Sequence, residues 1–119
     1  IINISSVAGR EVYPNGNVYC ASKFAVDALS KSMRIDLLPH SIKVTAINPG
    51  AVETEFSLVR YKGDSNKADA TYLGYTALSP MDIADAILYT ANLPEHVCIN
   101  DITITCTAQT DVNHFYKTN

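Results

Sequence analysis

The sequence predicts an α/β fold, because short apolar runs alternate with longer segments of helical pattern. Apolar runs typical of strands occupy residues 1–5, 43–47 and 99–106, and helical patterns occupy about 19–38 and 79–93. Strands separated by helices are typical of a parallel sheet, which helices cover on both faces. With 119 residues, 47% of them hydrophobic, the chain forms one domain at most and can build a core.

The first strand ends at Ser6 and is followed by a loop over residues 7–18. This loop is rich in turn-forming residues: Gly9, Pro14, Asn15 and Gly16. We expect the loop to bring Ser6 face to face with Tyr19 at the start of the helix. Tyr13 is expected to pack within the loop, the alternative being that it borders a pocket.

The long helix from Tyr19 to about Leu38 is expected to be buried on more than one side. A stripe of small side chains, suited to close approach of the sheet, consists of Ala21, Ala25, Ala28 and Ser32. Larger apolar side chains lie elsewhere around the helix: Phe24, Leu29, Met33 and Leu37. Pro39 ends the helix because proline has no backbone donor.

The second strand leads into Asn48-Pro49-Gly50, where the chain must turn sharply. Ligands of open α/β sheets bind at the carboxyl ends of the strands, so this segment is either a binding turn or a plain one. Residues 51–78 are too many for an idle connection and indicate a lid or binding element. Apolar side chains that could close over a ligand are Phe56, Leu58, Val59 and Tyr61.

Cations in the same segment could recognise an anionic substrate. Arg60 carries a guanidinium suited to a carboxylate, and Lys62 and Lys67 compete for that role. The alternative is that these cations are solvated or pair with nearby carboxylates: Glu53, Glu55 and Asp64.

The last helix begins with a strong capping signal, in which Ser79 is the N-cap, Pro80 follows it and Asp82 lies in the first turn. Its predicted core face consists of Ile83, Ile87 and Ala91. The last strand, residues 99–106, alternates in character and should have unlike faces. The polar tail, residues 109–119, either docks on another subunit or frays.

Composition narrows the classes of function. The net charge of −3 gives no reason to expect a nucleic-acid or anionic-membrane partner, and no apolar run is long enough to span a bilayer. The cysteines, Cys20, Cys98 and Cys106, are odd in number and indicate reduced thiols in a cytoplasmic protein. No spacing suggests a metal site, and the histidines are expected at the surface: His40, His96 and His114.

Tyr19 and Lys23 lie four residues apart and therefore share one face of the predicted helix. A tyrosine pKa is ordinarily about 10, and a nearby ammonium favours the phenolate, so Lys23 is expected to lower the pKa of Tyr19. Ser6, at the end of a strand and facing Tyr19, could hold a substrate carbonyl or alcohol oxygen. This spacing is also common by chance, in which case the pair is simply solvated.

The surrounding residues resemble one family. Asn-Ile-Ser-Ser-Val-Ala-Gly at 3–9, Tyr19 with Lys23, and Asn48-Pro49-Gly50 together resemble the short-chain dehydrogenase/reductase family. The segment 52–63 is similar to that of NADP-dependent 3-hydroxy acid dehydrogenases acting on serine and its relatives. The resemblance runs over the whole chain and implies the C-terminal half of a doubly wound, Rossmann-like parallel sheet.

The resemblance also implies a site and an activity. It assigns catalysis to Ser6, Tyr19 and Lys23, of which Ser6 also binds the substrate oxygen. The expectation that Arg60 binds the substrate's acid group comes from its own chemistry and not from the resemblance. The resemblance assigns NADP binding to Tyr19, Lys23, Pro49, Gly50, Val52 and Thr54. The implied reaction is hydride transfer between NADP and a small 3-hydroxy acid such as serine or 3-hydroxypropionate, in a homotetramer.

Parts of that family pattern are not present in residues 1–119. The five glycines are dispersed and form no glycine-rich turn for a pyrophosphate. In the family, a proton-relaying asparagine belongs to a helix before Ile1. We therefore expect residues 1–119 to be the C-terminal part of a single domain. The alternative is a non-catalytic remnant that acts as a binding or structural subunit.

Overall fold

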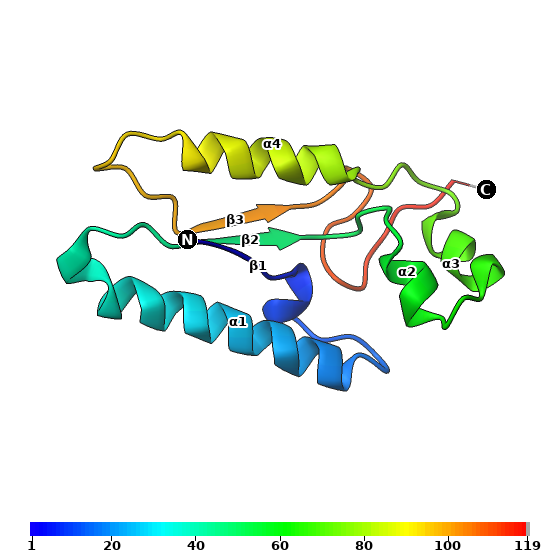
Figure 1. Ribbon diagram of the computed structural model, residues 1–119. Coiled ribbons are helices and arrows are strands. Elements are labelled where there is room, and N and C mark those ends of the chain that lie inside the picture. Colours follow the sequence, from blue (N-terminus) through cyan, green and yellow to red (C-terminus); the bar gives the residue numbers. More distant parts are fainter. Residues whose placement is uncertain (119) are drawn as a thin grey trace.

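The computed structural model describes residues 1–118 and shows a three-stranded parallel sheet in the order β1-β2-β3 (Figure 1). The strands are β1 (Ile2–Ile4), β2 (Thr45–Pro49) and β3 (Asp101–Ile104). The helices are η1 (Val7–Gly9), α1 (Asn17–Asp36), η2 (Leu38–His40), α2 (Phe56–Arg60), α3 (Ser65–Tyr72) and α4 (Pro80–Ala91). The predicted α/β fold with a parallel sheet is confirmed.

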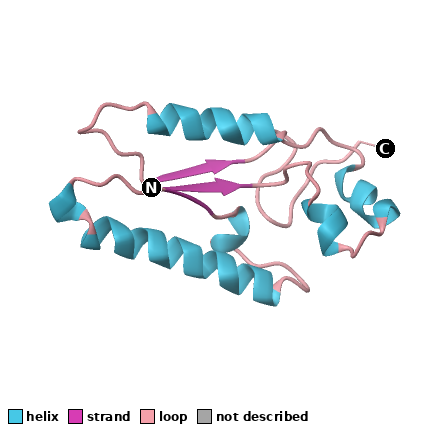
Figure 2. Ribbon diagram, viewed as in Figure 1, coloured by secondary structure: helices cyan, strands magenta, loops and turns pink. Residues whose placement is uncertain are grey.

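The sheet lies between two helical layers, with α1 on one face and α4 on the other (Figure 2). β2 is the central strand, and every one of its residues is buried. Ile47 is paired with Ile4 on one side and with Ile102 on the other. This packing places the core around β2 and brings the carboxyl ends of all three strands to one end of the molecule.

The boundaries of two strands differ from the prediction. β2 begins and ends two residues later than expected, because its ladder continues to Pro49, which is paired with Ile104. The next amide, of Gly50, still donates to the Ile104 carbonyl at 2.7 Å. β3 is shorter than predicted and covers the middle of the expected range.

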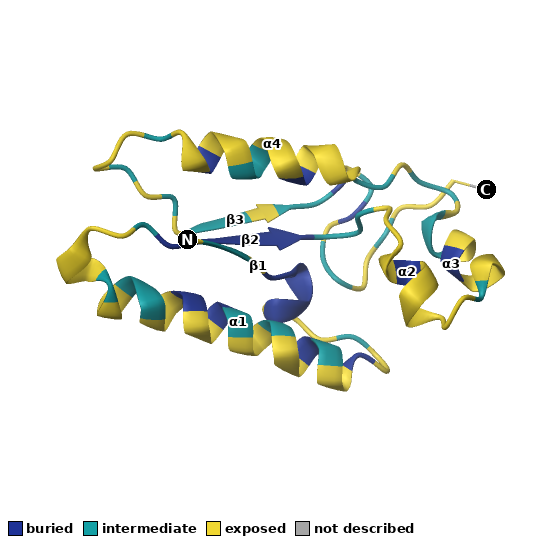
Figure 3. Cartoon of the chain, viewed as in Figure 1, coloured by how far each residue is buried: buried dark blue, intermediate teal, exposed yellow. Residues whose placement is uncertain are grey.

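The predicted packing face of α1 is wrong. The stripe of small residues is exposed throughout, and the side buried against the sheet carries Cys20, Asp27 and Ser30 (Figure 3). Ser30 is fully buried because its hydroxyl donates to the Val26 carbonyl and accepts from the Asn3 amide. Phe24 and Leu29 remain exposed, so α1 buries one side within this chain.

Close backbone approach to α1 instead depends on Gly9 in η1. A Cβ at Gly9 would lie 2.8 Å from the Lys23 carbonyl oxygen and 2.7 Å from Ser5 Oγ. Such distances are too short for real side chains, so glycine is required where η1 meets the helix.

The start of α4 is as predicted. Ser79 Oγ accepts from the Asp82 amide at 3.3 Å, and the Ser79 amide donates to Asp82 Oδ2 at 2.7 Å, which completes a capping box. On the core face, Ile83 is buried as expected, but Thr90 is buried in place of Ala91. The Thr90 hydroxyl donates within the helix at 2.9 Å to the Ile87 carbonyl, which permits its burial.

The tail does not fray over its described residues, since it folds back on the chain. Gln109 and Phe115 form an antiparallel bridge, and the Thr118 amide donates to the Gly74 carbonyl at 2.8 Å. The ring of Phe115 packs on Tyr75, with centroids 5.1 Å apart. Asn119 lies outside the described residues.

Other expectations concern the surface. All three histidines are exposed, and the cysteines are free thiols, of which Cys98 is exposed. No helix in residues 1–118 combines the length and the apolar character that crossing a membrane requires. Within the same range, no group of potential metal ligands comes together.

Candidate active site

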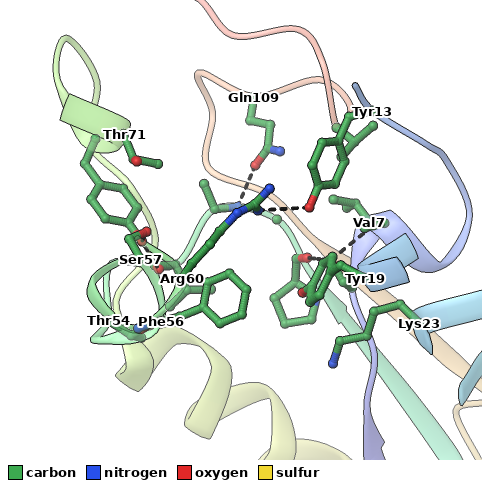
Figure 4. A pocket seen from close by; sticks show the side chains of 18 of the residues that line it. Val7, Tyr13, Tyr19, Lys23, Thr54, Phe56, Ser57, Arg60, Thr71 and Gln109 are labelled. Atoms are coloured by element: carbon green, nitrogen blue, oxygen red, sulfur yellow. Dashed lines mark hydrogen bonds between the residues drawn. The ribbon is translucent and has the colours of Figure 1, made fainter. Parts of the chain in front are cut away.

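A cavity of about 400 Å³ lies beyond the carboxyl ends of β1 and β2. Its walls come from the strand ends, η1, the start of α1, the helices α2 and α3, and the tail. Every residue predicted for the site lines it: Ser6, Tyr19, Lys23, Pro49, Gly50, Val52, Thr54 and Arg60. Figure 4 shows Tyr19 and Lys23 on one side, with Arg60 reaching across from α2.

Ser6 is held at the junction of the two strand ends. It is the N-cap of η1, and its Oγ accepts from the Ala8 amide at 3.1 Å. The same hydroxyl donates to the Pro49 carbonyl at 3.4 Å, a long and weak hydrogen bond. Ser6 is 8% exposed, so its hydroxyl faces the cavity from a nearly buried position.

Tyr19 and Lys23 lie in the first two turns of α1, as their spacing predicts. The Tyr19 ring packs against Phe56 and Tyr13, with centroids at 5.5 and 6.5 Å. Lys23 Nζ donates to the Ile4 carbonyl at 3.1 Å and lies 5.7 Å from the centre of the Tyr19 ring. The pair is therefore part of the cavity wall and is not simply solvated.

The electrostatics of this pair differ from the prediction. Burial raises the pKa of Tyr19 above its usual value, and the Ser6 hydroxyl and the Arg60 guanidinium lower it only in part. Burial also lowers the pKa of Lys23. Desolvation wins over attraction here because the ammonium is bonded to the Ile4 carbonyl and not to the phenol. Tyr19 thus keeps its proton at neutral pH and can act as a proton donor.

The turn after β2 is fixed from three directions. The Ala51 amide donates to Gln109 Oε1 at 2.8 Å, and the Val52 carbonyl accepts from the Tyr72 hydroxyl at 2.9 Å. Val52 forms a parallel bridge with Leu78. In this bridge the Leu78 amide donates to the Ala51 carbonyl, and the Glu53 amide donates to the Leu78 carbonyl. The N–H and C=O of Val52 therefore point away from Leu78.

One backbone donor of this turn is left over. No acceptor for the Val52 N–H occurs anywhere in residues 1–118, although Val52 lines the cavity. A backbone donor at a cavity wall next to a proton donor and an ammonium suits the carboxamide of a nicotinamide, so the residues present fit that group.

Arg60 reaches the cavity and the two competing lysines do not. Its Nη1 donates to the Tyr13 hydroxyl at 2.9 Å, and its guanidinium lies 5.2 Å from the centre of the Tyr13 ring. Lys67 forms an ion pair with Asp64 at 3.2 Å, which is the alternative role predicted from the sequence for these cations. Lys62 does not line the cavity. Tyr13 borders the cavity, so the expectation of simple loop packing is wrong for it.

Several cavity residues could not be anticipated. Tyr72 bonds both the Val52 carbonyl and Ser57 Oγ, the latter at 2.8 Å. Gln109 and Phe115 come from the tail, where the sequence shows no periodic pattern. The length of the segment 51–78 indicates a binding element, but it does not show which of its residues line the cavity.

The chain thus combines a parallel sheet with a cavity at its strand ends that Ser6, Tyr19 and Lys23 line together. A profile of the short chain dehydrogenases matches residues 1–63, more than half of the chain. The chain belongs to this family.

Individual relatives agree with this assignment. The chain is 40% identical over 117 residues to the NADP-dependent 3-hydroxy acid dehydrogenase of Schizosaccharomyces pombe, covering 98% of the chain and 45% of that protein. It is 46% identical over 109 residues to a sulfoacetaldehyde reductase of Chromohalobacter salexigens, covering 92% of the chain and 43% of that protein.

Among solved structures, a closed form of serine dehydrogenase complexed with NADP+ superposes with a TM-score of 0.91 at 42% identity. The match covers 100% of the chain and 48% of that structure. It confirms the predicted doubly wound, Rossmann-like fold, of which this chain spans a part. The chain spans less than half the length of each of these relatives.

Proposed function

We propose that the protein is an oxidoreductase that transfers a hydride between NADP and a small 3-hydroxy acid such as serine or 3-hydroxypropionate. Residues 1–119 are the C-terminal part of its single domain and supply the acid–base and nicotinamide side of the site. The observation that carries the proposal is the meeting of Ser6, Tyr19 and Lys23 at one cavity beside the unpaired Val52 N–H.

The proton is handled by Tyr19. In reduction, the Tyr19 phenol gives its proton to the carbonyl oxygen, and in oxidation the phenolate takes it back. Ser6 holds that oxygen through its hydroxyl, whose weak hydrogen bond to the Pro49 carbonyl can be exchanged for one to the substrate. Lys23 stabilises the negative charge that develops on Tyr19 as the phenol gives up its proton during reduction. NADP, when bound, supplies or accepts the hydride.

The cofactor is held by residues on two sides of the cavity. Lys23 and Tyr19 contact its ribose, and the turn at Pro49, Gly50 and Val52 holds the nicotinamide, with Thr54 adjacent. The free Val52 N–H supports this assignment, and Thr54 lines the same cavity. The choice of NADP over NAD is supported by the cofactors named for the two dehydrogenases described above.

Arg60 receives the acid group of the substrate. Its guanidinium is at the cavity, across from Tyr19 (Figure 4). The relatives are named for serine, 3-hydroxy acids and sulfoacetaldehyde, which all carry a carboxylate or sulfonate. A planar guanidinium can bind either anion with two hydrogen bonds.

We also infer a cytoplasmic homotetramer with no nucleic-acid or membrane partner. The exposed apolar side chains of α1, among them Phe24 and Leu29, support self-association through that helix. The exposed free thiol of Cys98 supports a reducing compartment.

A second candidate, of a different class, is a non-catalytic remnant that acts as a binding or structural subunit. Intact mass of the purified protein separates the two, because a mass near 12.9 kDa supports the second candidate. A heavier protein is then titrated with NADP+ and assayed for oxidation of serine and 3-hydroxypropionate. Failure to bind NADP+ contradicts the proposed oxidoreductase.

A further inference from the structure

Gln109 is a buried polar residue in the tail whose side chain is bonded at both ends. It is 6% exposed. Its Oε1 accepts from the Ala51 amide at 2.8 Å, and its Nε2 donates to the Asp111 carbonyl at 3.0 Å. A backbone N–H needs an acceptor and a carbonyl needs a donor, so these partners fix the orientation of the amide.

The turn after β2 is shaped to receive this amide. A Cβ built at Gly50 would overlap Gln109 Oε1 and would lie 2.9 Å from its Cδ. Gly50 therefore leaves the space that Gln109 occupies. The requirement for glycine in Asn48-Pro49-Gly50 comes from a side chain 59 positions further along the chain.

Gln109 holds the middle peptide of the proposed cofactor turn. Ala51 lies between Gly50, whose amide is bonded to the end of β3, and Val52, whose carbonyl is bonded to Tyr72. The Ala51 N–H belongs to the Gly50–Ala51 peptide and has Gln109 as its acceptor, whereas the peptide that carries the Val52 N–H is held through the Ala51 carbonyl by the Leu78 amide. Without Gln109, the Gly50–Ala51 peptide, which lies at the cavity and directly precedes Val52, loses its side-chain partner and can shift.

We propose that Gln109 is a positioning residue for the cofactor, acting through the backbone of residues 50–52. This inference rests on the proposed function, since it concerns the binding of NADP. It goes beyond it by placing a determinant of cofactor affinity in the C-terminal tail.

The rest of the tail has its own anchors. The Val112 amide donates to Glu11 Oε2 at 3.0 Å, and Asn113 Nδ2 donates to the Val12 carbonyl at 3.1 Å. Replacing Gln109 therefore removes the contact with the turn and leaves the tail attached. Asn113→Ala is the matched control, because it removes one tail-to-loop hydrogen bond without touching the turn.

The test measures NADP+ dissociation constants by calorimetry in the complete protein, beside thermal unfolding of the cofactor-free form. Gln109→Met keeps the length and removes both hydrogen bonds, and we expect it to weaken NADP+ binding about 5- to 30-fold. Asn113→Ala should stay within about twofold of wild type. If Gln109→Met also binds NADP+ within about twofold of wild type and only its unfolding midpoint is lower, the inference is overturned. A wild-type protein that does not bind NADP+ overturns the proposed function as well.

A double-mutant cycle gives a second readout. Gly50→Ala alone should weaken NADP+ binding, because the new Cβ displaces Gln109. In a Gln109→Ala background, Gly50→Ala should have much less effect, since the overlap with the Gln109 amide is gone and only Thr105 Cγ2, at 3.1 Å, stays close to the new Cβ. Independent, additive effects of the two changes overturn the inference.

Discussion

The cavity has two walls that are built in different ways. The strand-end wall, consisting of Ser6, Tyr19, Lys23 and Pro49, is set by backbone hydrogen bonds and by spacing along one helix. The loop wall, formed by residues 52–75 and the tail, is held by side chains that bond to distant parts of the chain. Arg60 and Tyr13 are 47 positions apart, and Gln109 and Ala51 are 58 apart.

This difference suggests a division of labour. The strand-end wall carries the groups of the proposed proton transfer, and moving any of them would disturb the sheet or α1. The loop wall can change its side chains without breaking the sheet, as is usual for loops on a rigid scaffold. Variants on the strand-end wall should therefore affect all substrates, and variants on the loop wall should discriminate among them.

The largest effect is expected for Tyr19→Phe. This change removes the proton donor and keeps the ring that packs on Phe56, so turnover should fall by about 10²- to 10⁴-fold for every substrate. NADP+ binding should be largely retained. Steady-state kinetics and cofactor titration measure the two quantities, with Tyr89→Phe, an exposed tyrosine on α4, as the control for loss of a tyrosine hydroxyl. Near-normal turnover of Tyr19→Phe would contradict the assignment.

Arg60→Ala should have the next largest effect and should be selective. Losing a charge-assisted hydrogen bond predicts a decrease in kcat/KM for 3-hydroxy acids of about 10- to 150-fold. A neutral alcohol of the same size should be almost unaffected. Lys62→Ala is the control, because Lys62 does not line the cavity. Equal losses for acid and alcohol would mean that Arg60 serves the fold and not substrate recognition.

Tyr72→Phe should have a smaller effect that is confined to the cofactor. It removes the hydrogen bonds to the Val52 carbonyl and to Ser57, so the NADP+ dissociation constant should rise about 2- to 10-fold. Tyr89→Phe changes an exposed tyrosine on α4 and provides the comparison in the same titration. An unchanged affinity in Tyr72→Phe would show that the turn does not need this bond.

The smallest effect concerns stability at alkaline pH. Burial is the main cause that raises the pKa of Tyr75 to about 12, so the folded state holds this proton more tightly than the unfolded chain. The stabilisation is fully present below the unfolded-state pKa of about 10 and is lost as pH rises through 12. The loss should be under about 1 kcal/mol, since much of the side chain meets solvent.

Urea unfolding at about pH 9 and pH 11 measures this contribution in wild type and Tyr75→Phe. Wild type should lose slightly more stability than the variant between the two conditions. Equal losses would show that Tyr75 titrates alike in the folded and unfolded chains.

The sequence predicted what depends on local pattern. The strands, the two long helices and the Ser79 cap follow from periodicity and capping chemistry, and Tyr19 and Lys23 follow from helical spacing. The packing face of α1 was mistaken because Ser30 is buried through a hydrogen bond from Asn3, 27 positions away, which no helical period reveals. The role of Gln109 depends on the space at Gly50, and that complementarity exists only in three dimensions.

The pKa of Tyr19 was mispredicted for a related reason. Spacing showed that Lys23 is near, but not that its ammonium would be bonded to the Ile4 carbonyl or that the phenol would be desolvated by Phe56 and Tyr13. Electrostatic effects depend on burial, which the sequence indicates only coarsely.

The weak hydrogen bond from Ser6 to Pro49 has a consequence for how a substrate enters. At 3.4 Å, the Pro49 carbonyl is a poor resting partner for the hydroxyl proton of Ser6. A substrate oxygen arriving between Ser6 and Tyr19 offers a better acceptor, so the hydroxyl can rotate toward it with little loss. The hydroxyl hydrogen of Ser6 can therefore change its acceptor by rotation about the Cβ–Oγ bond, and this exchange needs no movement of the backbone.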